Sequence, residues 1–163
     1  MNMLSNGVSK EDALAESQRI SRDNGRTPMQ WNDTEHAGFS QHEPWLGVNP
    51  NYVEINAANQ MQDDTSVFRF YQKLIALRKE NSVMAHGDFQ LCCPKEGPVI
   101  AYTRSLGEVT WLIIHNFSEE EQSFEHKKIQ SAEQVILSNY DEVKMENGQA
   151  KLRAYETLIA RIE

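Results

Sequence analysis

Two arginines four residues apart, Arg22 and Arg26, are the residues of this sequence best suited to bind a ligand. Each guanidinium offers a planar fork of donors that suits a carboxylate or a pair of hydroxyl groups. Asn24-Gly25 between them favours positive φ and a tight reversal, and Pro28 prevents a helix from continuing. The arginines would stand on the two sides of a compact turn. Taken alone, the pattern favours the simpler alternative, in which both arginines only tie the loop to nearby acidic groups.

A long irregular segment follows the arginines. A segment such as residues 32–50, without signals for a helix or a strand, is typically functional or packed against another part of the protein. Trp31, Phe39 and Trp45 lie in or beside it. Two interpretations of these aromatic rings stay open: they stack on the C–H faces of a sugar, or they anchor the segment by burial.

The sequence carries no signal for catalysis, metal binding or cofactor binding. It has no phosphate-binding loop and no serine–histidine or cysteine–histidine signature. His36 and His42 lack the spacing and the cysteine partners of a zinc site, so we interpret them as surface histidines. Cys92 and Cys93 are adjacent, which disfavours a disulfide between them and favours two inert thiols. We therefore expect no metal and no cofactor.

The composition excludes several classes of partner. The net charge of the 163 residues is −8 and the pI is about 5.1, which argues against nucleic acid and against anionic membranes as partners. No apolar run is long enough to span a bilayer, and the start of the chain lacks a signal-peptide pattern. We expect a cytoplasmic protein.

The elements around the arginines begin with helices. Residues 9–20 can form a helix with Ser9 as its N-cap and Asp12 three residues later, although its apolar face is thin. Residues 65–81 form the clearest helix of the sequence. Its apolar positions are Val67, Phe70, Tyr71, Leu74, Ile75 and Leu77. Because this stripe is broad, the helix must bury against a substantial partner.

After Gly87 the pattern changes to short runs of strand-forming residues separated by turn signals. The runs are residues 89–91, 99–106, 109–117, 122–125, 134–140, 143–145 and 151–162. Several short strands without helices between them predict an antiparallel sandwich. The continuous apolar run at 111–114 predicts a central strand, and Asn147-Gly148 predicts a hairpin turn.

Motifs in order along the chain resemble one glycosidase family. The longest is Ser-Arg-Asp-Asn-Gly-Arg-Thr-Pro-Met-Gln-Trp at residues 21–31. Shorter ones lie at residues 37–39, 44–45, 48–52, 54–56, 66–68, 71–80, 87–89 and 116–118. Together they resemble the C-terminal part of the α-amylase superfamily (glycoside hydrolase family 13), in its oligo-1,6-glucosidase and dextran glucosidase branch. Trehalose-6-phosphate hydrolases and sucrose isomerases are close relatives of that branch.

The resemblance implies a mixed fold in two parts. Residues 1–85 would be the end of a (β/α)8 barrel, comprising an active-site loop and the last barrel helix, and residues 86–163 a C-terminal β-sandwich called domain C. The catalytic aspartate and glutamate of the family lie upstream, so no catalytic residue is assigned to this chain. Relatives commonly have proline where this sequence has Ala154, a departure at a strand entry that touches no catalytic position.

The resemblance also gives the two arginines a role. Arg22 matches the arginine that reaches the sugar in the family's −1 subsite, and Arg26 matches the second arginine of the motif, at the rim of the same pocket. The leading hypothesis is a C-terminal fragment of a retaining α-glucosidase that cleaves terminal α-1,6-linked glucose from isomalto-oligosaccharides or dextran, the fragment alone being inactive. Alternatives are a stand-alone carbohydrate-binding or interaction module, a fragment of a trehalose-6-phosphate hydrolase or sucrose isomerase, and a truncated gene.

The expected partner is an oligosaccharide, bound by the full-length enzyme. A helix at residues 65–81 that evolved to pack against barrel neighbours would lack them here. Its apolar stripe could pack on the sandwich or on a second copy of the chain. We therefore also expect self-association through this helix.

Overall fold

The computed structural model describes residue 7 and residues 9–93, 97–132 and 134–162, and it does not describe the side chains of residues 18–20, 22 and 24. The chain divides into two compact units, Met1–Arg69 and Phe70–Glu163. Across the described ranges, no helix is long and apolar enough to cross a membrane.

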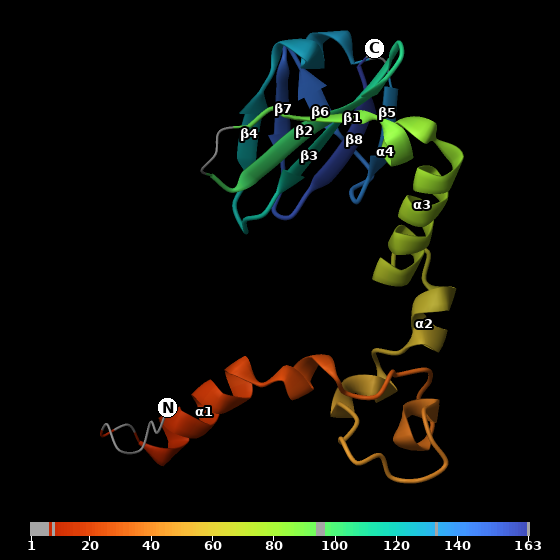
Figure 1. The fold of residues 1–163 in the computed structure, drawn as a ribbon, viewed down its shortest axis with the longest axis vertical. Coiled ribbons are helices and arrows are strands. Elements are labelled where there is room, and N and C mark those ends of the chain that lie inside the picture. Colours follow the sequence, from red (N-terminus) through yellow and green to blue (C-terminus); the bar gives the residue numbers. More distant parts are fainter. Residues whose placement is uncertain (1–6, 8, 94–96, 133, 163) are drawn as a thin grey trace. The chain divides into compact units, whose positions relative to one another are not determined.

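The first unit consists of short helical elements joined by irregular segments (Figure 1). They are α1 (Lys10–Ile20), η2 (Arg22–Gly25), η3 (Glu35–Gly38), η4 (Pro50–Val53) and α2 (Ala57–Gln62). α1 confirms the first predicted helix and its cap. The Ser9 hydroxyl donates to Asp12 Oδ2 at 2.7 Å and accepts from the Asp12 amide at 3.0 Å, which satisfies one of the free N–H groups at the helix start.

Three consecutive residues with positive φ turn the long loop back on itself. The φ angles of His36, Ala37 and Gly38 are 54°, 58° and 65°. Ala37 is fully buried, and its carbonyl accepts from the amides of Trp31 at 2.9 Å and Asn32 at 3.2 Å. At Gly38 a Cβ would lie 2.6 Å from Asn32 Oδ1, so glycine is required for space as well as for φ. Local hydrogen bonds therefore order the loop.

α3 (Val67–Glu80) confirms the second predicted helix. Just before it, Asp63 Oδ1 accepts from the Thr65 hydroxyl at 2.7 Å and from the Thr65 amide at 2.8 Å. These hydrogen bonds, the one from the hydroxyl first, lower the pKa of Asp63. The Ser66 hydroxyl accepts from the Arg69 amide at 3.2 Å and caps the first turn.

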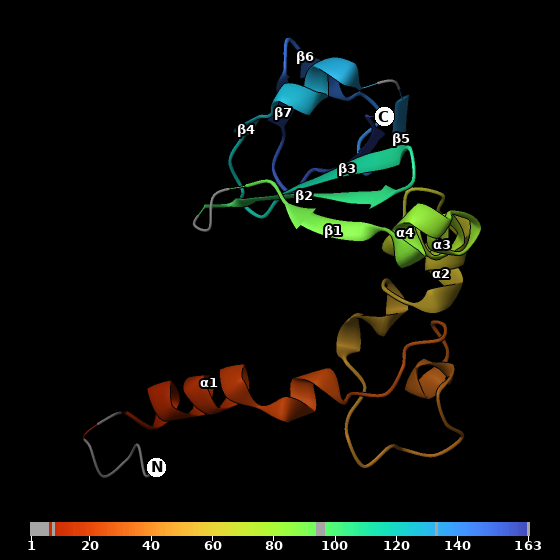
Figure 2. The same ribbon diagram turned by 45° about the horizontal axis from the view of Figure 1, so that its top comes forward.

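The second unit is an antiparallel sandwich, as predicted (Figure 2). One sheet has the strand order β1-β2-β3-β8-β5 and the other the order β4-β7-β6. The strands are β1 (Asp88–Leu91), β2 (Val99–Leu106), β3 (Val109–Asn116), β4 (Gln122–Glu125), β5 (Gln134–Ser138), β6 (Lys144–Glu146), β7 (Gln149–Leu152) and β8 (Thr157–Arg161). The turn between β6 and β7 is the predicted Asn147-Gly148, with φ of 51° and 80°.

The main core lies between the two sheets. Its buried members are Ala101, Leu112, Ile114, Phe124, Ile129, Ala150, Leu152, Leu158 and Ile162. β3 pairs with β2 on one side and with β8 on the other, which confirms the predicted central strand. Since neighbouring side chains of a strand point to opposite faces, Leu112 and Ile114 face this core, whereas Trp111 and Ile113 face outward.

A second, smaller core covers the outer face of the five-stranded sheet. It joins Trp111, Ile113 and Ile159 to Val83 of α4 (Ser82–His86), and Leu74 and Leu77 of α3 pack against it. Part of the apolar stripe of α3 is thus buried on the sandwich. Another row on the same helix, Val67, Tyr71 and Ile75, is 76%, 64% and 45% exposed.

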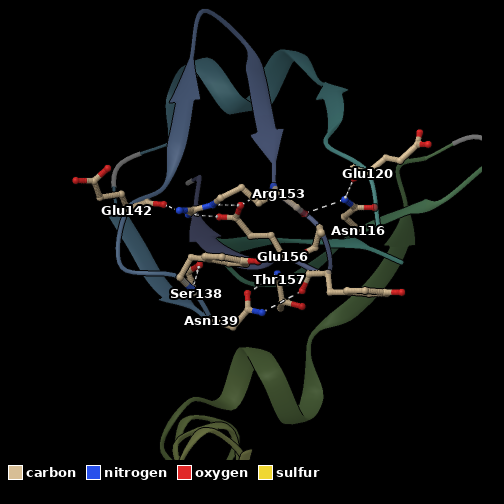
Figure 3. Close-up of polar contacts among 11 residues, drawn as sticks. Asn116, Glu120, Ser138, Asn139, Glu142, Arg153, Glu156 and Thr157 are labelled. Atoms are coloured by element: carbon tan, nitrogen blue, oxygen red, sulfur yellow. Dashed lines mark hydrogen bonds and ion pairs between the residues drawn. The ribbon is translucent and has the colours of Figure 1, made fainter. Parts of the chain in front are cut away.

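A polar turn separates β7 from β8 and divides the predicted run of strand-forming residues at 151–162 into two strands. The centre of this turn is Glu156, which is 1% exposed. The carboxylate accepts from the Arg153 amide at 2.8 Å and from its guanidinium at 3.0 and 3.2 Å (Figure 3). No glycine, proline or asparagine marks this turn. Side-chain bonds to the backbone make it, and these leave no simple sequence signal.

Candidate functional site

The first part of the 21–31 motif forms a short turn after α1 (Figure 1). The Ser21 hydroxyl caps η2 by accepting from the Asp23 amide at 3.2 Å, and the Arg26 amide donates to the Asp23 carbonyl at 2.9 Å. The predicted positive φ at this turn was wrong for Gly25, whose φ lies outside the left-handed region. A capped, right-handed 3-10 turn replaces it, because the Ser21 cap favours helical geometry.

The two arginines lie at opposite ends of this turn. The backbone of Arg22 begins η2, and the side chain of Arg22 is outside the described part of the structure. The side chain of Arg26 is 58% exposed, with Nη1 4.0 Å from Oδ1 of the equally exposed Asp23. An exposed pair at this distance is weak and screened by salt. The Arg26 guanidinium is therefore available to a ligand.

The second part of the motif is held much more firmly. The carbonyls of Gln30 and Trp31 accept from the amides of Ala57 and Ala58, the first residues of α2, at 2.9 and 3.0 Å. Asn56 caps the same helix by accepting from the Asn59 amide at 2.9 Å. These contacts satisfy N–H groups that a helix start leaves free. The motif thus has one end, Gln30 and Trp31, that is hydrogen-bonded to α2 and that we call the locked anchor. Its other end is an exposed turn that bears the arginines.

A hollow of about 260 Å³ opens beside Arg26. Its lining residues are Arg26, Thr27, Pro28, Met29, Phe39, Pro44, Trp45 and Leu46. Phe39 is 49% and Trp45 is 90% exposed. Burial therefore does not explain the Trp45 ring. The structure brings Phe39 and Trp45 together with Arg26, while the half-exposed Trp31 does not line this hollow.

This arrangement can bind a ligand through a guanidinium and aromatic surfaces. Asp23, which pairs with Arg26, is an exposed carboxylate. Nε2 of His36 lies 3.9 Å from Oε1 of its neighbour Glu35. Among the residues that the structure describes, no group of three or more His, Cys, Asp or Glu side chains is placed to hold a metal ion.

Comparison with known proteins identifies the family. Residues 2–87 match the family described as "Alpha amylase, catalytic domain", and residues 99–159 match "Alpha-amylase SusG C-terminal domain". An oligo-1,6-glucosidase of Halalkalibacterium halodurans is 42% identical over 94% of this chain and 28% of its own length. A glucan 1,6-alpha-glucosidase of Streptococcus dysgalactiae is 44% identical over 85% of this chain and 25% of its own length.

Solved structures agree with this result. The trehalose-6-phosphate hydrolase of Bacillus licheniformis superposes with a TM-score of 0.87 at 33% identity, over 98% of this chain and 30% of its own. The isomaltulose synthase of Erwinia rhapontici, solved with sucrose, superposes with a TM-score of 0.85 at 35% identity, over 98% and 29% of the two chains.

The chain belongs to the α-amylase family, in the branch of the oligo-1,6-glucosidases and glucan 1,6-α-glucosidases. It spans between a quarter and a third of the length of the relatives it matches. The match to a catalytic domain followed by a C-terminal domain agrees with a barrel-end segment and a C-terminal sandwich.

Proposed function

We propose that this chain supplies the C-terminal part of a retaining α-glucosidase that removes terminal α-1,6-linked glucose from isomalto-oligosaccharides or dextran. The observation that carries the proposal is the 21–31 motif, set on a locked anchor at Gln30 and Trp31 and ending in an exposed arginine turn. Relatives named for α-1,6-glucosidase activity, at 42% and 44% identity, support this linkage.

In this proposal residues 1–85 contribute the active-site loop and the last barrel helix, and residues 86–163 are domain C. Arg22 binds the glucose ring next to the cleaved bond, and Arg26 shapes the rim of the same pocket. Both roles use the fork of guanidinium donors, which matches neighbouring sugar hydroxyls. Loops of this kind build the active site of barrel enzymes.

A chimera tests the role of Arg22. Residues 9–163 would replace the matching part of the Halalkalibacterium halodurans enzyme, and hydrolysis of isomaltose would be followed. We expect an active chimera in which Arg22→Ala lowers kcat/KM by about 100-fold or more, because a donor to the reacting sugar is lost. The control is Lys10→Ala, which removes an exposed positive charge from α1 and should leave kcat/KM unchanged. A folded chimera that keeps full activity with Arg22→Ala would refute the role.

The chain alone should be inactive. Retaining hydrolysis needs two carboxyl groups about 5 Å apart across the sugar, one as nucleophile and one as acid and base. The resemblance assigns both to upstream segments. We expect no release of aryl alcohol from an aryl α-glucoside by rigorously purified chain, and measurable hydrolysis would overturn this expectation.

The same chimera can show which of three candidate substrates is preferred. A trehalose-6-phosphate hydrolase of Escherichia coli is 37% identical over 96% of this chain, so a phosphorylated disaccharide is an alternative substrate. Sucrose isomerisation is another, given the similarity to an isomaltulose synthase. Comparison of isomaltose, trehalose 6-phosphate and sucrose would separate the three, and we expect isomaltose to have the highest kcat/KM.

A stand-alone carbohydrate-binding module is a second candidate, favoured by the exposed Trp45 and Phe39 beside Arg26. In that case the chain itself would bind isomaltose saturably and change its tryptophan fluorescence, and Trp45→Ala would remove the binding. A chain that binds no sugar at this hollow favours the fragment hypothesis.

Self-association is also part of the proposal. The exposed row of α3, Val67, Tyr71 and Ile75, has i, i+4 spacing and forms one apolar stripe. Two copies of the chain could cover this stripe by packing against each other.

We also propose a cytoplasmic location. The free thiols of Cys92 and Cys93 accord with it.

A further inference from the structure

A second hollow lies entirely within the sandwich unit, at the outer face of the five-stranded sheet. Its volume is about 390 Å³, which is within the usual size of small-molecule sites. It is lined from the end of α3 and the start of α4, from the β2–β3 hairpin, and from β5 and β8. No part of the 21–31 motif contributes to it.

The floor of this hollow is a row of side chains across three neighbouring strands. In the sheet register Trp111 of β3 lies opposite Arg161 of β8, and Arg161 lies opposite Gln134 of β5. Residues directly opposite on antiparallel strands project from the same face. An indole, a guanidinium and an amide therefore stand side by side, and all three line the hollow.

Trp111 has a hydrogen-bonding group that the fold does not use. The residue is 5% exposed, and its indole N–H donates no hydrogen bond within the described part of the chain. The nitrogen is not among the fully buried side-chain atoms that lack a partner, so the N–H reaches solvent, where a ligand hydroxyl can take the place of water. This indole lines the hollow, where a bound molecule could supply the acceptor.

The remaining walls combine polar and apolar groups. Glu80 adds a carboxylate at the end of α3, and Leu106, Val109 and Ile136 add aliphatic surface. The hollow thus offers donors, acceptors and apolar walls in a small space. A hydroxyl group both donates and accepts, and a pyranose ring carries several hydroxyls together with C–H faces.

We propose that this hollow is a sugar-binding site of the sandwich unit, taking one neutral pyranose of a mono- or oligosaccharide. Trp111 and Arg161 donate to its hydroxyls, Gln134 donates and accepts, and Glu80 accepts. A neutral polyol fits better than a charged ligand, because Glu80 and Arg161 present one charge of each sign. None of the residues that line this site belongs to the segment of Arg22 and Arg26. The proposal therefore does not depend on the role proposed for these arginines.

The test is titration of the whole chain with isomaltose and with glucose. Binding is measured by calorimetry and by ligand-observed NMR. The key variant is Gln134→Ala, and Gln90→Ala is the matched control. Both glutamines are exposed and lie on edge strands of the same sheet, but only Gln134 lines the hollow. Trp111→Phe removes the indole N–H and keeps an aromatic ring.

We expect saturable binding whose Kd rises about tenfold with Gln134→Ala and similarly with Trp111→Phe, as for the loss of one good hydrogen bond. Gln90→Ala should leave the Kd unchanged, and so should Trp45→Ala, which alters only the hollow beside Arg26. Absence of saturable binding at high sugar concentration would overturn the proposal. So would binding that Trp45→Ala abolishes and Gln134→Ala does not affect, or an equal loss with Gln90→Ala.

Discussion

One buried residue of the sandwich, Glu156, makes several hydrogen bonds that hold a turn together. Glu156 organises the β7–β8 turn, and its contact with Arg153 raises the pKa of that guanidinium, mainly through the side-chain hydrogen bond. The Arg153 guanidinium also lies 3.9 Å above the Tyr140 ring. Because this buried carboxylate accepts three hydrogen bonds, one substitution at Glu156 should destabilise the whole turn.

Glu156→Gln should lower the free energy of unfolding by about 2 kcal/mol, because a carboxylate that accepts three hydrogen bonds becomes a neutral amide with one acceptor oxygen. Denaturant unfolding of the purified chain measures this. Glu108→Gln, at an exposed position in the β2–β3 turn, is the control and should have no effect. Equal stability of the two variants would contradict the role assigned to Glu156.

His115 should make the sandwich sensitive to mild acid. Its Nδ1 is 3.0 Å from the Thr157 hydroxyl, and burial lowers its pKa below the ordinary value of 6.5. The unfolded chain therefore binds a proton more readily than the folded chain does. Stability should be constant well above pH 6.5 and should fall as the pH drops below it, until the folded histidine is protonated as well.

The check is the midpoint of thermal unfolding at about pH 7.5 and at successively lower pH for the wild type and His115→Gln. Burial and the nearby Lys128 and Lys127 also lower the pKa of His126, so the variant should lose only part of the slope. An unchanged slope in His115→Gln would show that this histidine does not contribute.

Elements of the first unit depend on local hydrogen bonds more than on packing. The left-handed run at residues 36–38 presents the Ala37 carbonyl to Trp31 and Asn32, and these contacts connect the long loop to the motif anchor. The regular helix next to this loop, α2, spans only Ala57–Gln62. The position of the arginine turn therefore depends on a few backbone geometries that particular residues permit.

Gly38→Ala should loosen this loop by at least about 1 kcal/mol, because φ is positive and the new Cβ would meet the Asn32 side chain. Faster hydrogen exchange at the Trp31 and Asn32 amides would report the change. Gly25→Ala is the matched control, since a Cβ there has nothing within 4 Å. Similar exchange in both variants would contradict the assignment.

For the whole molecule, the exposed row of α3 is the surface that we propose for self-association. We expect concentration-dependent self-association of the chain in sedimentation equilibrium, and weaker association for Ile75→Glu, which places a charge on the row. Ile100→Glu in β2 is the control, because Ile100 and Ile75 are 42% and 45% exposed. A monomer at high concentration, or equal effects of both variants, would argue against an interface at α3.

Motifs and periodicity were enough to predict the family, both long helices and the antiparallel sandwich. The apolar spacing in residues 65–81 and the run at 111–114 report directly on which faces are buried. Local chemistry also fixes the Ser9 cap and the Asn147-Gly148 turn, because each needs only neighbouring residues.

Only the tertiary structure decided features that join distant segments. At the β7–β8 turn, the Asn116 side chain of β3 donates to the Arg153 carbonyl, 37 residues later in the sequence. The row of Gln134, Arg161 and Trp111 exists because sheet pairing brings three separated strands into register. A sequence pattern records neighbours along the chain, whereas a binding site is made by neighbours across it, and those are fixed by packing and register.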